Sequence, residues 1–325
     1  MLAWIGEQWE PWGLGAVPNR LRSLLLTRGP RTISKTVALI FAEPDPMPRV
    51  VVKRPRVPEA DGGLRREAAA LAAVQALGPG GVPGVPRLLF SGEHAAGLTV
   101  IETALTGQPL FSLLRAETYR ALALQATDWL VELGERGPAR PASGGRSVVE
   151  QALETFTRQF GSLVDPVLLR ESEQLLGSLG SLAHVVEQRD FSPWNVHVGP
   201  AGDLVVFDWE SAELDGVPML DLVYFLTYLA FFHDGALGRG RTRQSYRRSL
   251  DPSTFTGQVQ REATGRYAAR LGFDPALARA LRALTWMIHC RSDYLHLAAD
   301  AAAAPDPAAL GKSLFLGLWE EELRT

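Results

Sequence analysis

The chain has 325 residues, 46% hydrophobic and 21% charged, which are the proportions of an ordinary soluble globular protein. This length is typical of two domains or lobes, and the net charge of −3 argues against a nucleic-acid-binding protein. The single cysteine, Cys290, excludes an intramolecular disulfide and a cysteine-built zinc site. The apolar run Leu220–Phe232 is too short to span a membrane, and no secretion signal is recognisable, so a cytoplasmic protein is expected.

The first hundred residues predict a small antiparallel sheet with one helix. Residues 1–20 contain three tryptophans among Gly and Pro and are expected to form a partly helical lead-in that packs on this lobe. The predicted strands are Leu21–Thr27, Val37–Ala42, Arg49–Arg54, Arg87–Gly92 and Leu98–Thr103. The alanine-rich segment LRREAAALAAVQAL has apolar residues at helical spacing and predicts a helix. These elements make a compact lobe.

From Leu105 onward the pattern becomes mainly helical. The predicted helices are Pro109–Leu114, Glu117–Arg136, Val148–Gly161, Pro166–Leu179, Met219–Phe232, Phe255–Leu271, Asp274–Ala299 and Asp306–Glu322. A strand pair is predicted at Asn195–Val198 and Leu204–Phe207. The helix at 219–232 is nearly all apolar, which indicates burial on every side. Segments 137–147 and 235–253 are expected to be a loop and a polar connection, and 299–308 an interhelix turn.

Lysine is rare in this chain. Thirty of the 33 basic residues are arginine, and the lysines are Lys35, Lys53 and Lys312. The simplest cause is genomic base composition, which replaces exchangeable surface lysines by arginine. A lysine that persists against this drift is a candidate for a site that needs a compact ammonium rather than a guanidinium fork.

The segment Val185–Glu210 carries the clearest chemical signal. Asp190 and Asn195 form the pattern D-x-x-x-x-N, and Asp208 follows the second strand of the predicted hairpin. A hairpin that gathers two aspartates and an asparagine provides oxygen ligands suited to Mg²⁺. The same arrangement places a base beside a phosphoryl group in transfer. This segment predicts a kinase of small molecules.

Six motifs occur in one order between about Leu21 and Phe232. They are a strand lysine (Lys53), a helix glutamate in LRREAAAL (Glu67), VIETALTGQPL (Val100–Leu110), QRDFSPWN (Gln188–Asn195), VVFDWE (Val205–Glu210) and PMLDLVYF (Pro218–Phe225). With these motifs the chain resembles the aminoglycoside phosphotransferase and choline kinase-like family. The resemblance implies an α+β, protein-kinase-like two-lobed fold. Its small antiparallel-sheet N-terminal lobe, residues 1–104, would bind nucleotide, and its larger, mainly helical C-terminal lobe, residues 105–325, would be catalytic and bind the acceptor.

The resemblance also implies roles for the residues of the second lobe. Asp190 would be the catalytic base that accepts the proton of the attacking hydroxyl, and the alternative is a loop-capping aspartate. Asn195 and Asp208 would bind Mg²⁺ between the phosphates. Glu210 would reach a second metal ion or be an exposed acid. Asp221 would be a structural aspartate that holds the catalytic loop, since a charge on so apolar a helix needs partners.

In the first lobe, the resemblance makes Lys53 the clamp on the α- and β-phosphates, with Glu67 holding its ammonium. The alternatives are a strand-edge lysine and a surface glutamate. The backbone groups of Glu102, Thr103 and Ala104 would form the hinge that meets the adenine edge of ATP.

Segment Arg28–Thr36 departs from the family because it has only Gly29 in place of a G-x-G-x-x-G series. The Ser34 hydroxyl and backbone amides near Ile33–Lys35 are expected to cover the phosphates instead. Lys35 either assists there or is solvated.

A second departure lies at the catalytic loop, where Gln188-Arg189-Asp190 replaces the family's His-Gly-Asp. That histidine is a structural hydrogen-bonding residue, and a glutamine amide can make such bonds. The replacement motivates a second hypothesis, a nucleotide-binding pseudokinase with a regulatory or binding role. A protein kinase is disfavoured, because the interval between Asp208 and Asp221 has no room for an activation segment ending in A-P-E.

The acceptor is less defined. Between Asp190 and Gly238 there are eight acidic residues and no Lys or Arg, which would favour a cationic acceptor unless most of these acids face solvent. Five arginines follow between Arg239 and Arg248, either as a solvated loop or as a rim for an anionic acceptor. We expect an ATP- and Mg²⁺-dependent phosphotransferase acting on a hydroxyl of an amino sugar, aminoglycoside, amino alcohol or sugar metabolite. Nucleic-acid and membrane partners are not expected, and the oligomeric state is open.

Overall fold

The computed structural model describes residues 1–26, 35–95, 97–137, 148–180, 182, 184–299 and 305–324. The chain forms two compact units. The first unit consists of Met1–Ser112, Gln188–Asp190 and Trp194–Leu214, and the second of Leu113–Glu187, Phe191–Pro193 and Asp215–Thr325. The catalytic hairpin expected from the sequence therefore clusters with the first hundred residues.

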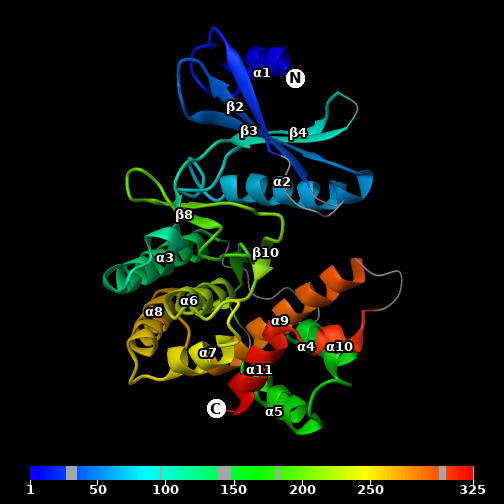
Figure 1. Ribbon diagram of the computed structural model, residues 1–325, viewed down its shortest axis with the longest axis vertical. Helices are drawn as coiled ribbons and strands as arrows, with labels where there is room; N and C mark the ends of the chain where they lie inside the picture. Colours follow the sequence, from blue (N-terminus) through cyan, green and yellow to red (C-terminus); the bar gives the residue numbers. More distant parts are fainter. Residues whose placement is uncertain are drawn as a thin grey trace. The chain divides into compact units, whose positions relative to one another are not determined.

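The first unit is built on a five-stranded antiparallel sheet (Figure 1). Its strands are β1 (Leu21–Leu26), β2 (Lys35–Ala42), β3 (Pro48–Pro55), β4 (Leu88–Glu93) and β5 (Leu98–Thr103), in the order β1-β2-β3-β5-β4. The five strands expected from the sequence are all present. The 3-10 helix η1 (Pro58–Ala60) and the helix α2 (Asp61–Gln75) connect β3 to β4.

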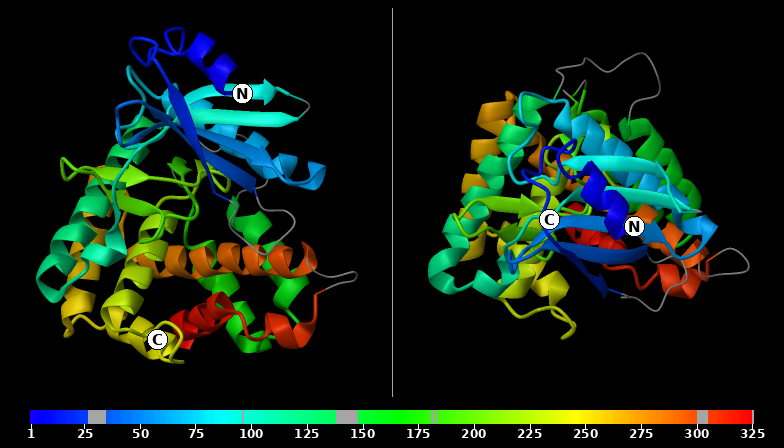
Figure 2. Two further views of the ribbon diagram at one scale, coloured as in Figure 1. Left: turned by 45° about the horizontal axis from the view of Figure 1, so that its top comes forward. Right: turned by 90° about the horizontal axis from the view of Figure 1, so that it is seen from above.

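Helices cover both faces of this sheet (Figures 1 and 2). On one face, helix α1 (Leu2–Gln8) and the residue after it bury Ile5 and Trp9 against Val50, Val52 and Ile101. The lead-in expected from the sequence is thus partly helical, and its helix is held by aromatic and aliphatic burial.

Helix α2 covers the opposite face. Its residues Leu64 and Ala68 pack against Leu98 and Val100 of β5. Side chains of a strand alternate between the faces, so Val100 faces α2 while Ile101 faces α1. The face toward α2 is the one on which the polar residues described below lie.

A smaller sheet carries the catalytic hairpin. Strands β6 (Gln108–Pro109), β8 (Val196–Val198) and β9 (Leu204–Val206) form it in the order β6-β8-β9. Gly84 joins this hairpin to the loop before β4, because its carbonyl accepts a hydrogen bond from the Val206 amide at 2.8 Å. Gly84 has φ +78°, and a Cβ atom there would lie 1.8 Å from the Leu204 carbonyl oxygen. Only glycine permits so close an approach.

The second unit is mainly helical. Its helices are α3 (Ala116–Arg136), α4 (Val148–Phe160), α5 (Pro166–Gly177), α6 (Leu220–His233), α7 (Thr242–Leu250), α8 (Phe255–Leu271), α9 (Ala278–Ala299), α10 (Pro307–Leu310) and α11 (Leu314–Arg324). The remaining short elements are η3 (Pro275–Leu277) and β7 (Val185–Glu187) in this unit, and η2 (Leu110–Leu113) and β10 (Glu213–Gly216), each of which includes residues of both units; β10 pairs with β7. Helix α6 is buried on every side, as its apolar sequence predicts, and α3, α7, α8 and α9 pack around it.

Two expectations about these elements are wrong. Segment 235–253 is not a simple connection, because it contains α7. The sequence of this helix shows no hydrophobic pattern, because Tyr246 is the one large apolar side chain on its buried face and the other two buried residues are serines. The short helix expected at 109–114 is present as the 3-10 helix η2, and only its first residue belongs to β6. The last helix is divided into α10 and α11, and the Ser313 hydroxyl accepts the Leu316 amide at the start of the latter.

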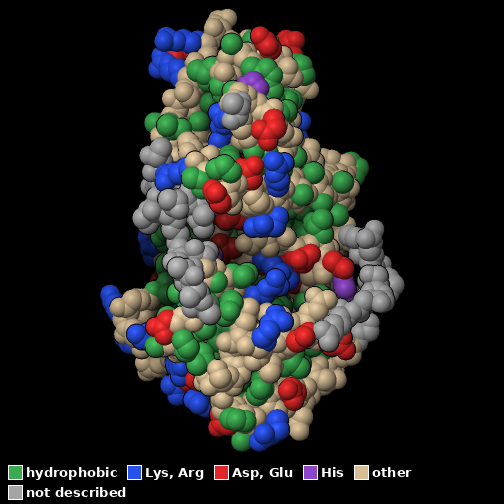
Figure 3. Space-filling model, turned by 90° about the vertical axis from the view of Figure 1, so that its right-hand side faces the viewer, with side chains coloured by type: hydrophobic (Ala, Val, Ile, Leu, Met, Phe, Trp, Pro, Cys, Tyr) green, Lys and Arg blue, Asp and Glu red, His purple; other side chains and the backbone are tan. Residues whose placement is uncertain are grey.

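On the face in Figure 3, acidic and basic side chains lie interspersed, in agreement with the small net charge. Within the described ranges, no helix is both long and apolar enough to cross a bilayer.

Candidate active site

A buried lysine lies between two buried glutamates in the first unit. The Lys53 ammonium contacts Glu67 Oε1 at 2.6 Å and Glu102 Oε1 at 2.7 Å. Lys53, Glu67 and Glu102 are only 8%, 1% and 3% exposed. A lysine so enclosed must be paired, so the strand-edge lysine considered from the sequence is ruled out, as is a surface glutamate at position 67.

The pairing follows from strand register. Lys53 of β3 is opposite Val100 of β5, so Lys53, Val100 and Glu102 point to the same face of the sheet. That face is covered by α2, where Glu67 lies between Leu64 and Ala68, which pack on β5. The three charged groups meet because each lies on the covered side of its element.

The pKa values of the two glutamates are shifted in opposite directions. Burial raises the pKa of Glu67, but Lys53 and Lys35 outweigh that effect and hold it below its ordinary value. Burial also raises the pKa of Glu102, and Lys53 offsets this only in part. The pKa of Lys53 is lowered by burial but raised overall by Glu102 and Glu67. Among the described residues, Glu102 Oε2 is buried without a hydrogen-bond partner, so Glu102 is the less stabilised of the two acids.

Lys35 extends this cluster to the catalytic hairpin. It is the first residue of β2, and Val37, two residues on, is opposite Lys53. The alternation of strand side chains therefore places both lysines on the face toward α2. The Lys35 ammonium lies 3.1 Å from Glu67 Oε2, 3.0 Å from Asp208 Oδ1 and 3.1 Å from Glu210 Oε2. The sequence left open whether Lys35 is solvated, and these three contacts show that it is not.

Three carboxylates could hold a divalent cation. Oxygen atoms of Glu67, Asp208 and Glu210 all lie within 4.8 Å of one another, and carboxylate oxygens are the ligands that Mg²⁺ prefers. Asp208 adopts φ 61°, a left-handed conformation that is rare for a residue with a side chain and concentrates at functional sites. These donors fit a magnesium ion.

The catalytic loop holds the side chain of Asp190. The Asn195 Nδ2 group donates to Asp190 Oδ2 at 2.7 Å and to the Asp190 carbonyl at 3.1 Å. The amide nitrogen of Asn195 therefore orients the predicted base, and its Oδ1 atom is the part of the side chain suited to a metal ion.

Gln188 connects this loop to the strand end that carries Asp208. Its Nε2 group donates to the carbonyls of Phe207 and Asp208 at 3.0 and 2.6 Å, and its Oε1 accepts the Asp190 amide at 2.9 Å. The side chain is completely buried. The glutamine thus makes structural hydrogen bonds of the kind expected from the histidine that it replaces.

Replacing Gln188 with leucine will lower the free energy of unfolding by about 1–3 kcal/mol, because buried backbone groups lose their partners. It will also reduce the turnover of ATP, since Asp190 and Asp208 lose their connection. Urea unfolding and a coupled ADP assay measure the two effects. Gln260→Leu is the matched control, because Gln260 is also buried and its Oε1 has no partner in the described part of the chain. Equal stability losses in both variants would contradict the role of Gln188.

The predicted hinge residues Glu102 and Thr103 end β5, and Ala104 follows it. The Thr103 amide donates to the Arg87 carbonyl and the Ala104 amide to the Arg49 carbonyl, both at 2.9 Å. These two N–H groups therefore form hydrogen bonds within the first unit. The side chain of Glu102 was not assigned a role from the sequence, although it contacts Lys53 directly. The predicted phosphate contact of Ser34 and the backbone amides before it lie outside the described residues.

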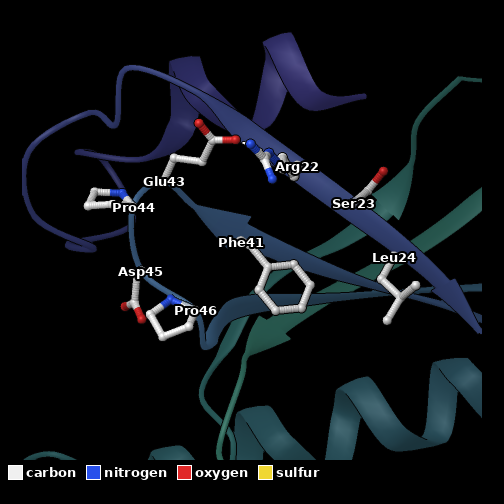
Figure 4. Close-up of a pocket in the computed structure, with 8 residues that line it drawn as sticks. All are labelled: Arg22, Ser23, Leu24, Phe41, Glu43, Pro44, Asp45 and Pro46. Atoms are coloured by element: carbon white, nitrogen blue, oxygen red, sulfur yellow. Dashed lines mark ion pairs between the residues drawn. The ribbon is translucent and has the colours of Figure 1, made fainter.

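A separate hollow of about 560 Å³ lies beside β1. Figure 4 shows Arg22 and Glu43 pointing toward one another at its rim, with Phe41 and Leu24 lining it. None of the polar residues described above lines this hollow. It is therefore distinct from the candidate site.

The model of the phosphotransferase enzyme family matches residues 36–255, more than half of the chain. The chain belongs to this phosphotransferase family. By this membership it is a small-molecule kinase, which confirms the family resemblance and the enzyme class predicted from the sequence. A search of curated proteins finds no match.

Solved structures of aminoglycoside phosphotransferases share the fold. The APH(4)-Ia ternary complex with ADP and hygromycin B is 13% identical, with a TM-score of 0.54 and 98% and 97% of the two chains covered. The APH(2")-IIia complex with GDP and kanamycin is 15% identical, with a TM-score of 0.51 and coverages of 99% and 98%. The gentamicin complex of APH(2")-IIa is 14% identical, with a TM-score of 0.50 and coverages of 98% and 96%. These likenesses confirm the predicted protein-kinase-like fold of the phosphotransferase family.

Proposed function

We propose that the protein is an ATP- and Mg²⁺-dependent kinase that transfers the γ-phosphate to a hydroxyl group of a small, amino-bearing molecule. The observation that carries the proposal is the set of carboxylate oxygens of Glu67, Asp208 and Glu210, gathered within 4.8 Å beside the buried Lys53. A divalent cation and an ammonium beside one another are the groups that neutralise a triphosphate in kinases.

Each residue has a distinct task in this proposal. Asp190 accepts the proton of the attacking hydroxyl, and its carboxylate is oriented by the Asn195 amide. Asp208 and Asn195 Oδ1 would hold Mg²⁺ together with the carboxylates of Glu67 and Glu210, and the ion would supply positive charge to the phosphate oxygens. Lys53 binds the α- and β-phosphates while Glu67 keeps its ammonium in place.

The nucleotide-binding lobe is proposed to be residues 1–104, with hinge contacts at Glu102, Thr103 and Ala104, and the catalytic and acceptor-binding lobe residues 105–325. Solved family members are complexes with ADP and with GDP, and ATP is the nucleotide we propose here. The bonds of Gln188 support an active enzyme, because the pseudokinase hypothesis was motivated by this replacement.

The charge pattern supports a cationic acceptor. The α7 arginines, considered as a rim for an anion, have acidic partners: Arg243 with Glu320 and Arg247 with Glu321, both at 3.2 Å. Those guanidinium groups are therefore less available to an anion. Solved members of the family contain gentamicin, kanamycin and hygromycin B. An aminoglycoside, amino sugar or amino alcohol is the acceptor class that we propose.

Measurement of ADP release across aminoglycosides, amino alcohols and neutral sugars tests the proposal. We expect release to rise with amino-bearing acceptors, to exceed release with neutral sugars, and to stop when EDTA removes Mg²⁺. Mass spectrometry of the acceptor identifies the phosphorylated product. Nucleotide-induced thermal stabilisation without transfer to any acceptor would instead support a pseudokinase.

A further inference from the structure

The ammonium of Lys35 lies where a metal ion would have to bind. It contacts one oxygen from each carboxylate of the acidic group, at 3.1 Å from Glu67 Oε2, 3.0 Å from Asp208 Oδ1 and 3.1 Å from Glu210 Oε2. A lysine ammonium has three N–H donors. All three therefore have a carboxylate acceptor within this group.

The charge of the cluster explains why a cation is held there. Four carboxylates, those of Glu67, Glu102, Asp208 and Glu210, surround two ammonium groups, which leaves a formal excess of two negative charges. Without Lys35, the excess would rise to three, close to the buried Glu67. Partly buried acids of like charge repel one another strongly, so Lys35 stabilises the cluster in the absence of other cations.

A magnesium ion and the Lys35 ammonium are mutually exclusive at these oxygens. Mg²⁺ binds carboxylate oxygens at about 2.0–2.1 Å and requires octahedral geometry. An ion at the same oxygens would occupy the space of the ammonium, and the two like charges would repel. The four-carbon stem of lysine is flexible, so the ammonium can leave while β2 stays in place.

We infer that Lys35 is a built-in cation of the proposed Mg²⁺ site, which it occupies in the nucleotide-free protein and vacates when metal and nucleotide bind together. This inference rests on the proposed function. A nucleotide phosphate offers the displaced ammonium new acceptors, whereas a metal ion alone offers none. Metal binding and nucleotide binding are therefore positively coupled through Lys35.

Binding of Mn²⁺ alone, measured by electron paramagnetic resonance, tests the inference. Removing the charge with Lys35→Met or Lys35→Gln will tighten Mn²⁺ binding to the nucleotide-free protein by about tenfold, within the range of ordinary coupling between sites. Lys35→Arg, which keeps the charge, will bind Mn²⁺ as weakly as the unchanged protein. Lys312→Met is the matched control, because Lys312 is an exposed lysine in the second unit. Thermal unfolding verifies that each variant is folded.

The Mn²⁺ titration, repeated in the presence of a non-hydrolysable ATP analogue, measures the coupling between metal binding and nucleotide binding. The analogue will strengthen Mn²⁺ binding less in Lys35→Met than in the unchanged protein. Equal Mn²⁺ affinities in all variants, abolished by Asp208→Asn, would overturn the role of Lys35 and leave the proposed metal site intact. Absence of Mn²⁺ binding in every variant, with and without the analogue, would overturn the proposed metal site as well.

Discussion

Replacing Asp190 with asparagine will lower the rate of phosphoryl transfer by about 10²–10⁴-fold, the range usually lost with a catalytic base. Asparagine retains an oxygen that can accept the Asn195 Nδ2 hydrogen bond, which is 2.7 Å long in the structure. The loop geometry and the stability should therefore be preserved. The side chain loses only its ability to accept the proton of the attacking hydroxyl.

Turnover of ATP with an active acceptor measures this effect, and nucleotide affinity by calorimetry separates it from binding. The matched control is Asp203→Asn, because Asp203 is an exposed aspartate in the turn of the same hairpin. Asp203→Asn is expected to leave turnover unchanged. If Asp190→Asn turned over ATP at the normal rate, the proton acceptor would have to be another group.

The second large effect concerns stability. Glu322 of α11 has no exposed surface. Arg282 donates to both of its carboxylate oxygens, at 3.0 and 2.8 Å, and the Tyr246 hydroxyl donates at 2.7 Å. Burial, followed by the adjacent Glu322 carboxylate, raises the pKa of Tyr246, so the phenol remains a donor. This network joins α7, α9 and α11 in the core of the second unit.

Glu322→Ala will lower the free energy of unfolding by about 3–5 kcal/mol, because it leaves the Arg282 charge buried without its partner. Urea unfolding at neutral pH measures the loss. The control is Glu320→Ala, whose ion pair with Arg243 at 3.2 Å involves a half-exposed arginine and contributes about 0–1 kcal/mol. A loss no larger than that of the control would mean that Arg282 finds another acceptor or becomes hydrated.

Local patterns were sufficient to predict the sheet and most helices. The valine run of β3, the apolar residues of β5 and the alanine-rich α2 each indicate their own structure, and the order of motifs indicated the family. Helix α7 could not be predicted in this way, because its buried face carries Tyr246 and two serines and so shows no hydrophobic pattern.

The candidate site was predicted less completely. Motifs indicated Lys53, Asp190 and Asp208, but the contacts of Glu102 and Lys35 depend on which strands are neighbours and in which register. A single sequence does not contain that information. The rarity of lysine and the position of Lys35 at the end of segment 28–36 both drew attention to this residue. Strand alternation starting at Lys35 predicts that its side chain points toward α2.

The glycine at position 84 has a consequence for how the protein can be divided. Asp190, Asn195, Asp208 and Glu210 follow residue 112 in the chain, yet their hairpin is part of the first compact unit and is attached there through Gly84. From the same unit, Glu67 supplies the third carboxylate and Lys35 supplies the ammonium that contacts Glu67 and Asp208. A fragment that begins at Leu113 would therefore retain the sequence motifs of a kinase but lack the surroundings that give them their geometry.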